Sequence, residues 1–118
     1  MPLPQVVSRN GQLIPSSDAH ISIFNPVIFG AFGVYESIQL YQGVFFRLDD
    51  HLQRLADSAA AIDLDLPAGL EQIAQWMAAV VAANDCRQAL ISYVCPGPHA
   101  GPRAGDLHLA GGAARLSG

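Results

Sequence analysis

The grouping of two amphipathic helical segments between shorter strand-like runs is the feature that most constrains the fold. Apolar residues recur at helical spacing in two stripes: Leu48, Leu52, Leu55, Ala59 and Ile62, and then Leu70, Ile73, Ala74, Met77 and Val81. This period predicts helices over residues 48–62 and 70–84. We expect Asp49 or Asp50 to cap the first helix. Helices grouped together among strands joined by short turns indicate the α+β class, with a small, mainly antiparallel sheet and two helices.

The strand-like runs are separated by residues that favour turns. Asn10-Gly11 lies between apolar runs at residues 6–8 and 12–14, and it predicts a hairpin because both residues tolerate positive φ. A polar turn at residues 16–18 leads to an alternating run at 21–24, which we predict to be a strand ended by Asn25-Pro26. The apolar stretch 27–33 contains two glycines, and we expect it to form a buried loop.

A second hairpin is predicted for residues 34–47, with its turn at Gln42-Gly43. Alternation divides its first strand between two faces: Val34, Glu36 and Ile38 on one, and Tyr35, Ser37 and Gln39 on the other. The run 88–94 predicts a last, buried strand. Residues 1–95 are therefore expected to form one α+β domain.

The end of the chain has a different composition. Fourteen of the 23 residues from 96 to 118 are Gly, Ala or Pro, and no periodicity is visible there. We expect this part to be a loop or tail that begins an interdomain region.

Charge and cysteine content exclude several classes of function. The net charge is -4, and the six basic residues are scattered arginines without a single lysine. Nucleic-acid binding and attachment to a membrane surface are therefore not expected. No apolar run is long enough to span a bilayer. The two cysteines are too few for a disulfide scaffold, and a reducing cytoplasm is the expected compartment.

Few residues indicate chemistry by spacing alone. The four histidines form no ligand cluster with the cysteines, so no metal site is expected. Arg54 lies one helical turn from His51, beside the apolar stripe, where its planar fork could bind a phosphate. Spacing alone favours the alternative, an ordinary surface ion pair with Asp50 or Asp57. By the same standard Tyr35 and Ser37 indicate sheet packing, and Arg103 indicates a solvated loop charge.

Three stretches taken in order resemble the class IV aminotransferase family. The first is Asn10-Gly11 followed by residues 18–24, and the second is residues 33–38 followed by 41–43. The third is residues 46–55, with a His-x-x-Arg-Leu pattern at His51, Arg54 and Leu55, followed by residues 58–59. The resemblance covers roughly residues 5–95 in matching order and spacing.

The resemblance implies a fold, a cofactor and a reaction. Members have the fold called type IV, in which pyridoxal phosphate lies between a small N-terminal α+β domain and a larger C-terminal domain. Most are homodimers that act on amino acids and 2-oxo acids. A C-terminal lysine holds the cofactor as a Schiff base. Because this chain has no lysine, it contains no catalytic residue of that kind. We expect it to be a fragment that lacks the C-terminal cofactor-binding domain and is inactive alone.

Five residues take roles from the resemblance. Arg54 matches the arginine that contacts the cofactor phosphate, and His51 matches the histidine that supports that corner. Tyr35 and Ser37 match positions that line the substrate pocket of branched-chain members. Arg103 resembles an arginine that binds the substrate carboxylate in D-amino-acid members. The chain departs from the family pattern at three places, where Phe32 replaces an acidic residue, Ser92 an arginine and Gly105 a histidine.

Three hypotheses of function follow. The first is the N-terminal part of an aminotransferase of the branched-chain or D-amino-acid type. The second is the same part of an aminodeoxychorismate lyase, which differs in the half that this sequence does not contain. The third is a non-catalytic dimerisation or binding module that kept the fold.

Overall fold

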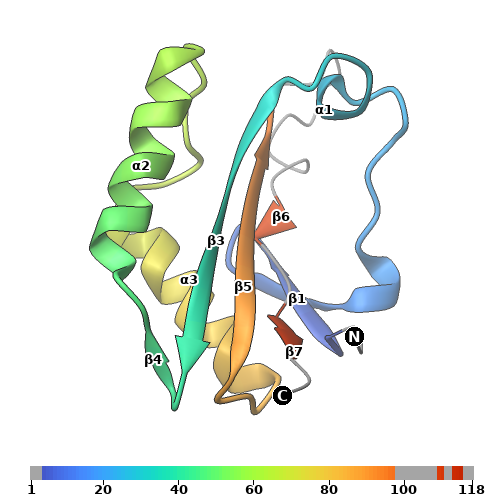
Figure 1. The fold of residues 1–118 in the computed structure, drawn as a ribbon. Coiled ribbons are helices and arrows are strands. Elements are labelled where there is room, and N and C mark those ends of the chain that lie inside the picture. The colour runs from blue at the N-terminus through green and yellow to red at the C-terminus, as the bar shows by residue number, and fades with distance from the viewer. Residues whose placement is uncertain (1–3, 98–108, 111–112, 116–118) are drawn as a thin grey trace.

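The chain folds into two small sheets and two long helices, in agreement with the predicted α+β class (Figure 1). The computed structural model describes residues 4–97, 109–110 and 113–115. The larger sheet has the strand order β4-β3-β5-β7, and the smaller one has the order β2-β1-β6. The helices α2 (Leu48–Ala61) and α3 (Leu70–Ala83) agree with the predicted segments to within a residue at each end. No helix of the described part is long and apolar enough to cross a bilayer.

The antiparallel pair β3 (Gly33–Tyr41) and β5 (Ala89–Pro96) forms the centre of the larger sheet, in a register that runs from Gly33↔Pro96 to Leu40↔Ala89. Alternate residues of β3 are buried, beginning with Val34 and Glu36, as the sequence predicted. The last strand begins one residue later and ends two residues later than the predicted 88–94.

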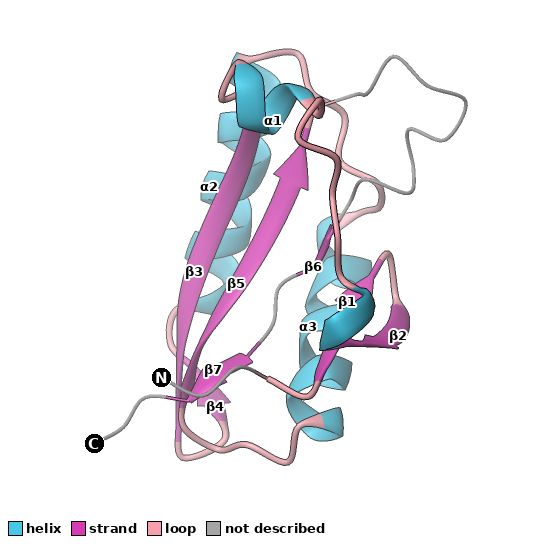
Figure 2. Cartoon of the chain, turned by 90° about the vertical axis from the view of Figure 1, so that its right-hand side faces the viewer, coloured by secondary structure: helices cyan, strands magenta, loops and turns pink. Residues whose placement is uncertain are grey.

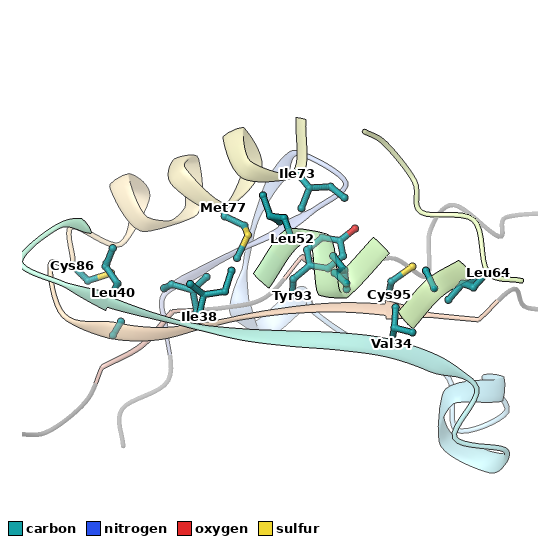
Figure 3. Close-up of a cluster of buried hydrophobic side chains, with 14 residues drawn as sticks. Val34, Ile38, Leu40, Leu52, Leu64, Ile73, Met77, Cys86, Tyr93 and Cys95 are labelled. Atoms are coloured by element: carbon teal, nitrogen blue, oxygen red, sulfur yellow. The ribbon is translucent and has the colours of Figure 1, made fainter. Parts of the chain in front are cut away.

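The hydrophobic core lies between this sheet and the two helices (Figure 3). Strand side chains such as Ile38 and Tyr93 meet Leu52 of α2 and Met77 of α3 there. Several core side chains are completely buried: Ile38, Leu40, Leu55, Ile73, Ala89, Ile91 and Cys95. Such packing, rather than helix propensity, supplies most of the stability of helices this short.

Both predicted hairpins are present. The strands β1 (Val6–Arg9) and β2 (Gln12–Pro15) meet at Asn10 and Gly11, whose φ angles are 50° and 88°. The turn between β3 and β4 (Val44–Phe45) has Gln42 and Gly43 at φ 50° and 78°. Two consecutive positive φ angles match the twist of the flanking strands, which is why Asn-Gly predicts the first hairpin so well.

The prediction of a strand at residues 21–24 is wrong. After the short helix η1 (Ser16–Asp18), Figure 2 shows a long loop that runs to the one-turn helix α1 (Pro26–Phe29). Ile23 and Phe24 are 65% and 71% exposed, so alternation there does not reflect a buried face. The side chain of Asn25 accepts a 2.9 Å hydrogen bond from the amide of Val27. The buried loop predicted for 27–33 is also wrong, because Ile28 is 55% exposed and the segment includes part of α1.

The predicted cap of the first long helix is wrong as well. Asp49 and Asp50 lie inside the first turn of α2, where their charges favour the positive end of the helix dipole. The capping position belongs to Arg47, which has a φ of 53° and makes no capping hydrogen bond with its side chain. Instead Arg47 donates to Asp50 at 2.8 Å. The hairpin return leaves the chain in this left-handed conformation immediately before the helix, which moves the start by one residue or more.

The expectation of a loop or tail from residue 96 onward is wrong for two short segments. The strand β6 (Leu109–Ala110) pairs with β1, and β7 (Ala113–Arg115) pairs with β5. Strands of two or three small residues carry no periodicity, because the neighbouring backbone selects them rather than a buried side-chain pattern. Residues 98–108, and Arg103 with them, lie outside the described part of the chain.

Asn84 joins the end of α3 to the beginning of β1. Its Oδ1 accepts hydrogen bonds from the amides of Gln5 and Val6 at 3.0 and 3.2 Å. Its Nδ2 donates to the carbonyls of Val6 and Val80, both at 2.8 Å. One side chain thus satisfies four backbone groups and ties the smaller sheet to the helical layer.

Asn84→Ala should lower the free energy of unfolding by about 2–3 kcal/mol, because partly buried backbone groups lose their partners. Urea denaturation followed by circular dichroism measures this change. The matched control is Gln72→Ala on the exposed face of α3, which should change stability by less than about 0.5 kcal/mol. Equal effects of the two substitutions would contradict the joining role of Asn84.

Candidate functional site

Three polar side chains from β3 and α2 form one cluster. The carboxylate of Glu36 accepts hydrogen bonds from Arg54, with Nε to Oε1 at 2.7 Å and Nη2 to Oε2 at 3.0 Å. His51 Nδ1 lies 2.6 Å from Glu36 Oε2. Only 5% of the Glu36 side chain is exposed, whereas 22% of His51 and 67% of Arg54 are. The site therefore has a buried carboxylate at its base and an arginine at its mouth.

Strand alternation and helical spacing bring these residues together. Glu36 lies between Val34 and Ile38 on the face of β3 that the helices cover. His51 and Arg54 are three residues apart on α2 and therefore share one edge of that helix. The predicted proximity of His51 and Arg54 is confirmed by their shared contact with Glu36.

The structure corrects the predicted partners of Arg54. Asp50 pairs with Arg47, and Asp57 accepts a 3.0 Å hydrogen bond from Gln53, so neither is the partner that spacing favoured. Glu36 was not predicted to be a site residue. The signal was present in the sequence, since Glu36 is a charged residue on the apolar face of a predicted strand, and a buried charge requires a partner.

The electrostatics of the cluster keep Glu36 ionised. Burial acts to raise the pKa of Glu36, but hydrogen bonds from Arg54 and His51 outweigh burial and lower the pKa below its ordinary value of 4.5. The hydrogen bonds to Glu36 raise the pKa of Arg54. An ionised carboxylate can only accept hydrogen bonds, so Nδ1 of His51 must carry the proton that it shares with Glu36. If the ring is neutral, Nε2 is an acceptor.

The lowered pKa of Glu36 predicts a pH dependence of stability. A group with a depressed pKa in the folded state stabilises the fold above its unfolded pKa, and this contribution disappears as the pH falls through the folded value. The stability advantage of the unsubstituted chain over Glu36→Gln should therefore be constant between about pH 6 and 8 and shrink below about pH 4.5. Urea denaturation at a series of pH values checks this. An advantage that grew toward acid pH would contradict the pairing.

A shallow hollow opens beside the cluster. Its volume is about 370 Å³, and its lining consists of Phe46, Arg47, Asp50, His51 and Arg54. Arg47 and Asp50 neutralise each other across 2.8 Å, with both side chains about two thirds exposed. In the described part of the chain, Nη1 of Arg54 has no hydrogen-bond partner. The hollow therefore offers guanidinium N–H donors to a small anion.

The other predicted site residues lie on the opposite face of the sheet. Tyr35 is 72% exposed, and the hydroxyl of Ser37 lies 3.0 Å from that of Ser92 on the paired strand β5. Alternation along β3 directs Tyr35 and Ser37 away from the helices and from Glu36. The structure thus brings Ser37 together with Ser92, but it does not bring Tyr35 and Ser37 together with the Arg54 cluster.

Two further polar groups of the core do not form a reactive site. Tyr93 pairs with Glu36 across the sheet and is 1% exposed, and its hydroxyl has no partner in the described part of the chain. Burial raises the pKa of Tyr93 well above its ordinary value and raises the pKa of Cys95 to about 11. Both groups are therefore protonated at neutral pH, and Cys95 is not a thiolate nucleophile.

Comparison with known proteins places these motifs in one family. Residues 33–109 match the family described as amino-transferase class IV. The chain is 34% identical over 85 residues to a putative branched-chain-amino-acid aminotransferase of Methanocaldococcus jannaschii, covering 72% of this chain. It is 37% identical over 76 residues to a D-alanine aminotransferase of Listeria monocytogenes, covering 64% of this chain.

Solved structures show the same fold. A branched-chain aminotransferase of Thermoproteus uzoniensis, crystallised with norvaline, is 30% identical and superposes with a TM-score of 0.79 over 97% of this chain. The branched-chain amino acid aminotransferase of Escherichia coli has a TM-score of 0.83 at 22% identity. The chain spans 30% and 26% of the lengths of the two curated relatives and 41% of each of these structures.

Proposed function

Because the chain belongs to the amino-transferase class IV family, we propose that it forms the N-terminal part of a pyridoxal-phosphate-dependent amino-acid aminotransferase. The branched-chain and D-amino-acid types are favoured, because the relatives described above carry those names. The observation that carries the proposal is the arginine at the mouth of the hollow, whose guanidinium is held in place by Glu36 while part of it faces outward.

The residues of the hollow fit the phosphate of this cofactor. A phosphate ester is a compact anion, and guanidinium N–H groups are well-matched donors for it. Structures of the Thermus thermophilus branched-chain enzyme contain N-(5'-phosphopyridoxyl)-L-glutamate or pyridoxamine 5'-phosphate. In this chain we assign phosphate binding to Arg54, and to His51 the support of Glu36 beneath it. When bound, pyridoxal phosphate supplies a reactive carbonyl and an electron-withdrawing ring.

The amine that tethers the cofactor must come from outside these residues. The chain has no lysine, and the guanidinium groups of its arginines stay protonated and do not act as nucleophiles. We therefore propose that the 118-residue chain neither tethers pyridoxal phosphate nor transaminates by itself. Its part is to bind the phosphate and to line one side of the pocket.

A hybrid enzyme tests the proposal. In this hybrid the chain replaces the matching segment of the Methanocaldococcus jannaschii relative, which supplies the remaining domain. We expect the hybrid to transfer an amino group from a branched-chain or D-amino acid to a 2-oxo acid, and the 118-residue chain alone to be inactive. Transamination by the purified chain alone would contradict the proposal. So would a folded hybrid that binds pyridoxal phosphate and transaminates neither class of substrate.

We further propose that Tyr35, Ser37 and Arg103 contact the substrate. The support is the exposure of Tyr35, the hydroxyl pair that Ser37 forms with Ser92, and the family resemblance of Arg103. In the hybrid, Tyr35→Ala should raise KM for the amino acid by roughly tenfold, because an aromatic contact is lost. Its dissociation constant for pyridoxal phosphate should not change. Equal loss of cofactor binding and substrate affinity would contradict a role on the substrate side.

We also propose that the assembled enzyme is a cytoplasmic homodimer. Side chains at one end of the chain, among them Ile23, Phe24, Ile28 and Tyr35, are more than half exposed and are suited to burial against the remaining domain or a second subunit. Cys86 and Cys95 are free thiols, which is compatible with a reducing compartment. Sedimentation of the hybrid as a monomer at micromolar concentration would contradict the dimer.

A further inference from the structure

Glu36 is the one charged side chain that is buried among the described residues. A buried carboxylate costs free energy, and replacing a buried ion pair by apolar side chains is often neutral or stabilising. The core around Glu36 is apolar, with Val34 and Ile38 beside it on the same face. Packing therefore does not require a carboxylate at this position, which directs attention to what the carboxylate does to Arg54.

The two hydrogen bonds from Arg54 occupy only one edge of its guanidinium. That group has five N–H bonds, and Glu36 accepts one from Nε and one from Nη2. Both N–H bonds of Nη1 and the second N–H of Nη2 remain. Nη1 and Nη2 together form the end of the planar fork, which can donate two parallel hydrogen bonds to a second anion.

His51 restricts the carboxylate itself. Its Nδ1 donates to Oε2, the same oxygen that receives Nη2 of Arg54, so both oxygens of Glu36 are engaged. Rotation of the carboxylate would break at least one of these bonds. The orientation of the guanidinium is thus set by a buried group that is itself held on two sides.

We propose that Glu36 is a positioning residue, which holds one edge of the Arg54 guanidinium so that the end of the fork faces the hollow and receives the cofactor phosphate. This inference rests on the proposed function. Glu36 does not touch the phosphate; it acts through Arg54.

Charge and positioning predict opposite results when Glu36 is neutralised. Removal of a nearby negative charge strengthens binding of an anion by Coulomb attraction alone. Loss of positioning weakens binding, because glutamine offers a single acceptor and places an NH₂ group against Nη2. The sign of the change in phosphate affinity therefore separates the two explanations.

Inorganic phosphate titrated into the ¹⁵N-labelled 118-residue chain gives this sign, with the Nε–H resonance of Arg54 as the reporter. Glu36→Gln should raise the phosphate dissociation constant by roughly tenfold, as the loss of a charge-assisted hydrogen bond does. It should also accelerate solvent exchange of the Arg54 Nε–H. Glu36→Asp, which keeps the charge but shortens the side chain, should weaken phosphate binding too. Backbone amide spectra establish that each variant is folded.

Two comparisons complete the experiment. In an Arg54→Lys background there is no fork to orient, so Glu36→Gln should no longer weaken phosphate binding. Asp50→Asn removes another carboxylate of the same hollow, one that pairs with Arg47 and does not contact Arg54, and it should not weaken binding.

Unchanged or tighter phosphate binding by the folded Glu36→Gln variant would overturn the positioning role. If Arg54→Lys itself leaves phosphate affinity unchanged, the phosphate role in the proposed function is wrong. Weaker binding in Arg54→Lys together with unchanged binding in both Glu36 variants would refute the inference alone.

Discussion

Arg54→Ala in the hybrid enzyme should raise the dissociation constant for pyridoxal phosphate by roughly 10- to 100-fold, because two or more charge-assisted hydrogen bonds to the phosphate are lost. The guanidinium that provides them is two thirds exposed and is already oriented by Glu36. Equilibrium dialysis against the cofactor measures the change directly. Arg54→Lys should lie between the two, since an ammonium keeps the charge but not the planar fork.

Arg47→Ala is the matched control for this prediction. Arg47 lines the same hollow and carries the same charge, but its described partner is Asp50 at 2.8 Å rather than Glu36. Its removal should change the dissociation constant by less than about threefold, because exposed charges are screened over short distances. If Arg47→Ala and Arg54→Ala weakened binding equally, the site would act through net charge. The assignment of phosphate binding to Arg54 would then be wrong.

Leu55→Ala should lower the free energy of unfolding of the chain by about 3–4 kcal/mol, a value within the range for fully buried leucines. Leu55 is completely buried in the core between α2 and the sheet. Its truncation removes apolar contacts and leaves a cavity that a close-packed core fills only in part. Small domains have total stabilities of about 5–15 kcal/mol, so this loss is a large fraction of the total.

The control for core packing is Leu13→Ala, which makes the same chemical change at a side chain that is 44% exposed. It should cost less than about 1 kcal/mol. Urea denaturation of both variants with an unchanged m value gives the comparison. A loss below about 1 kcal/mol for Leu55→Ala would show that the helical layer packs against the sheet more loosely than the structure describes.

The sequence alone determined the elements that depend on near neighbours. The Asn10-Gly11 hairpin, the alternating faces of the strand that contains Val34, and both long helices follow from periods of two and 3.6 residues and from backbone preferences at turns. The same local reasoning placed His51 and Arg54 on one edge of a helix. The ordered motifs also indicated the family, which residues 33–109 confirm.

Tertiary structure decided what depends on distant segments. The loop at residues 21–24 alternates like a strand, yet Ile23 and Phe24 have no sheet to cover. The pairs of β6 with β1 and of β7 with β5 depend on backbone groups more than 20 residues away. Above all, Arg54 has acidic neighbours within helical reach, but it pairs with Glu36, 18 residues earlier in the chain. Local spacing cannot rank these partners, because only folding shows which carboxylate is removed from water and therefore needs the arginine most.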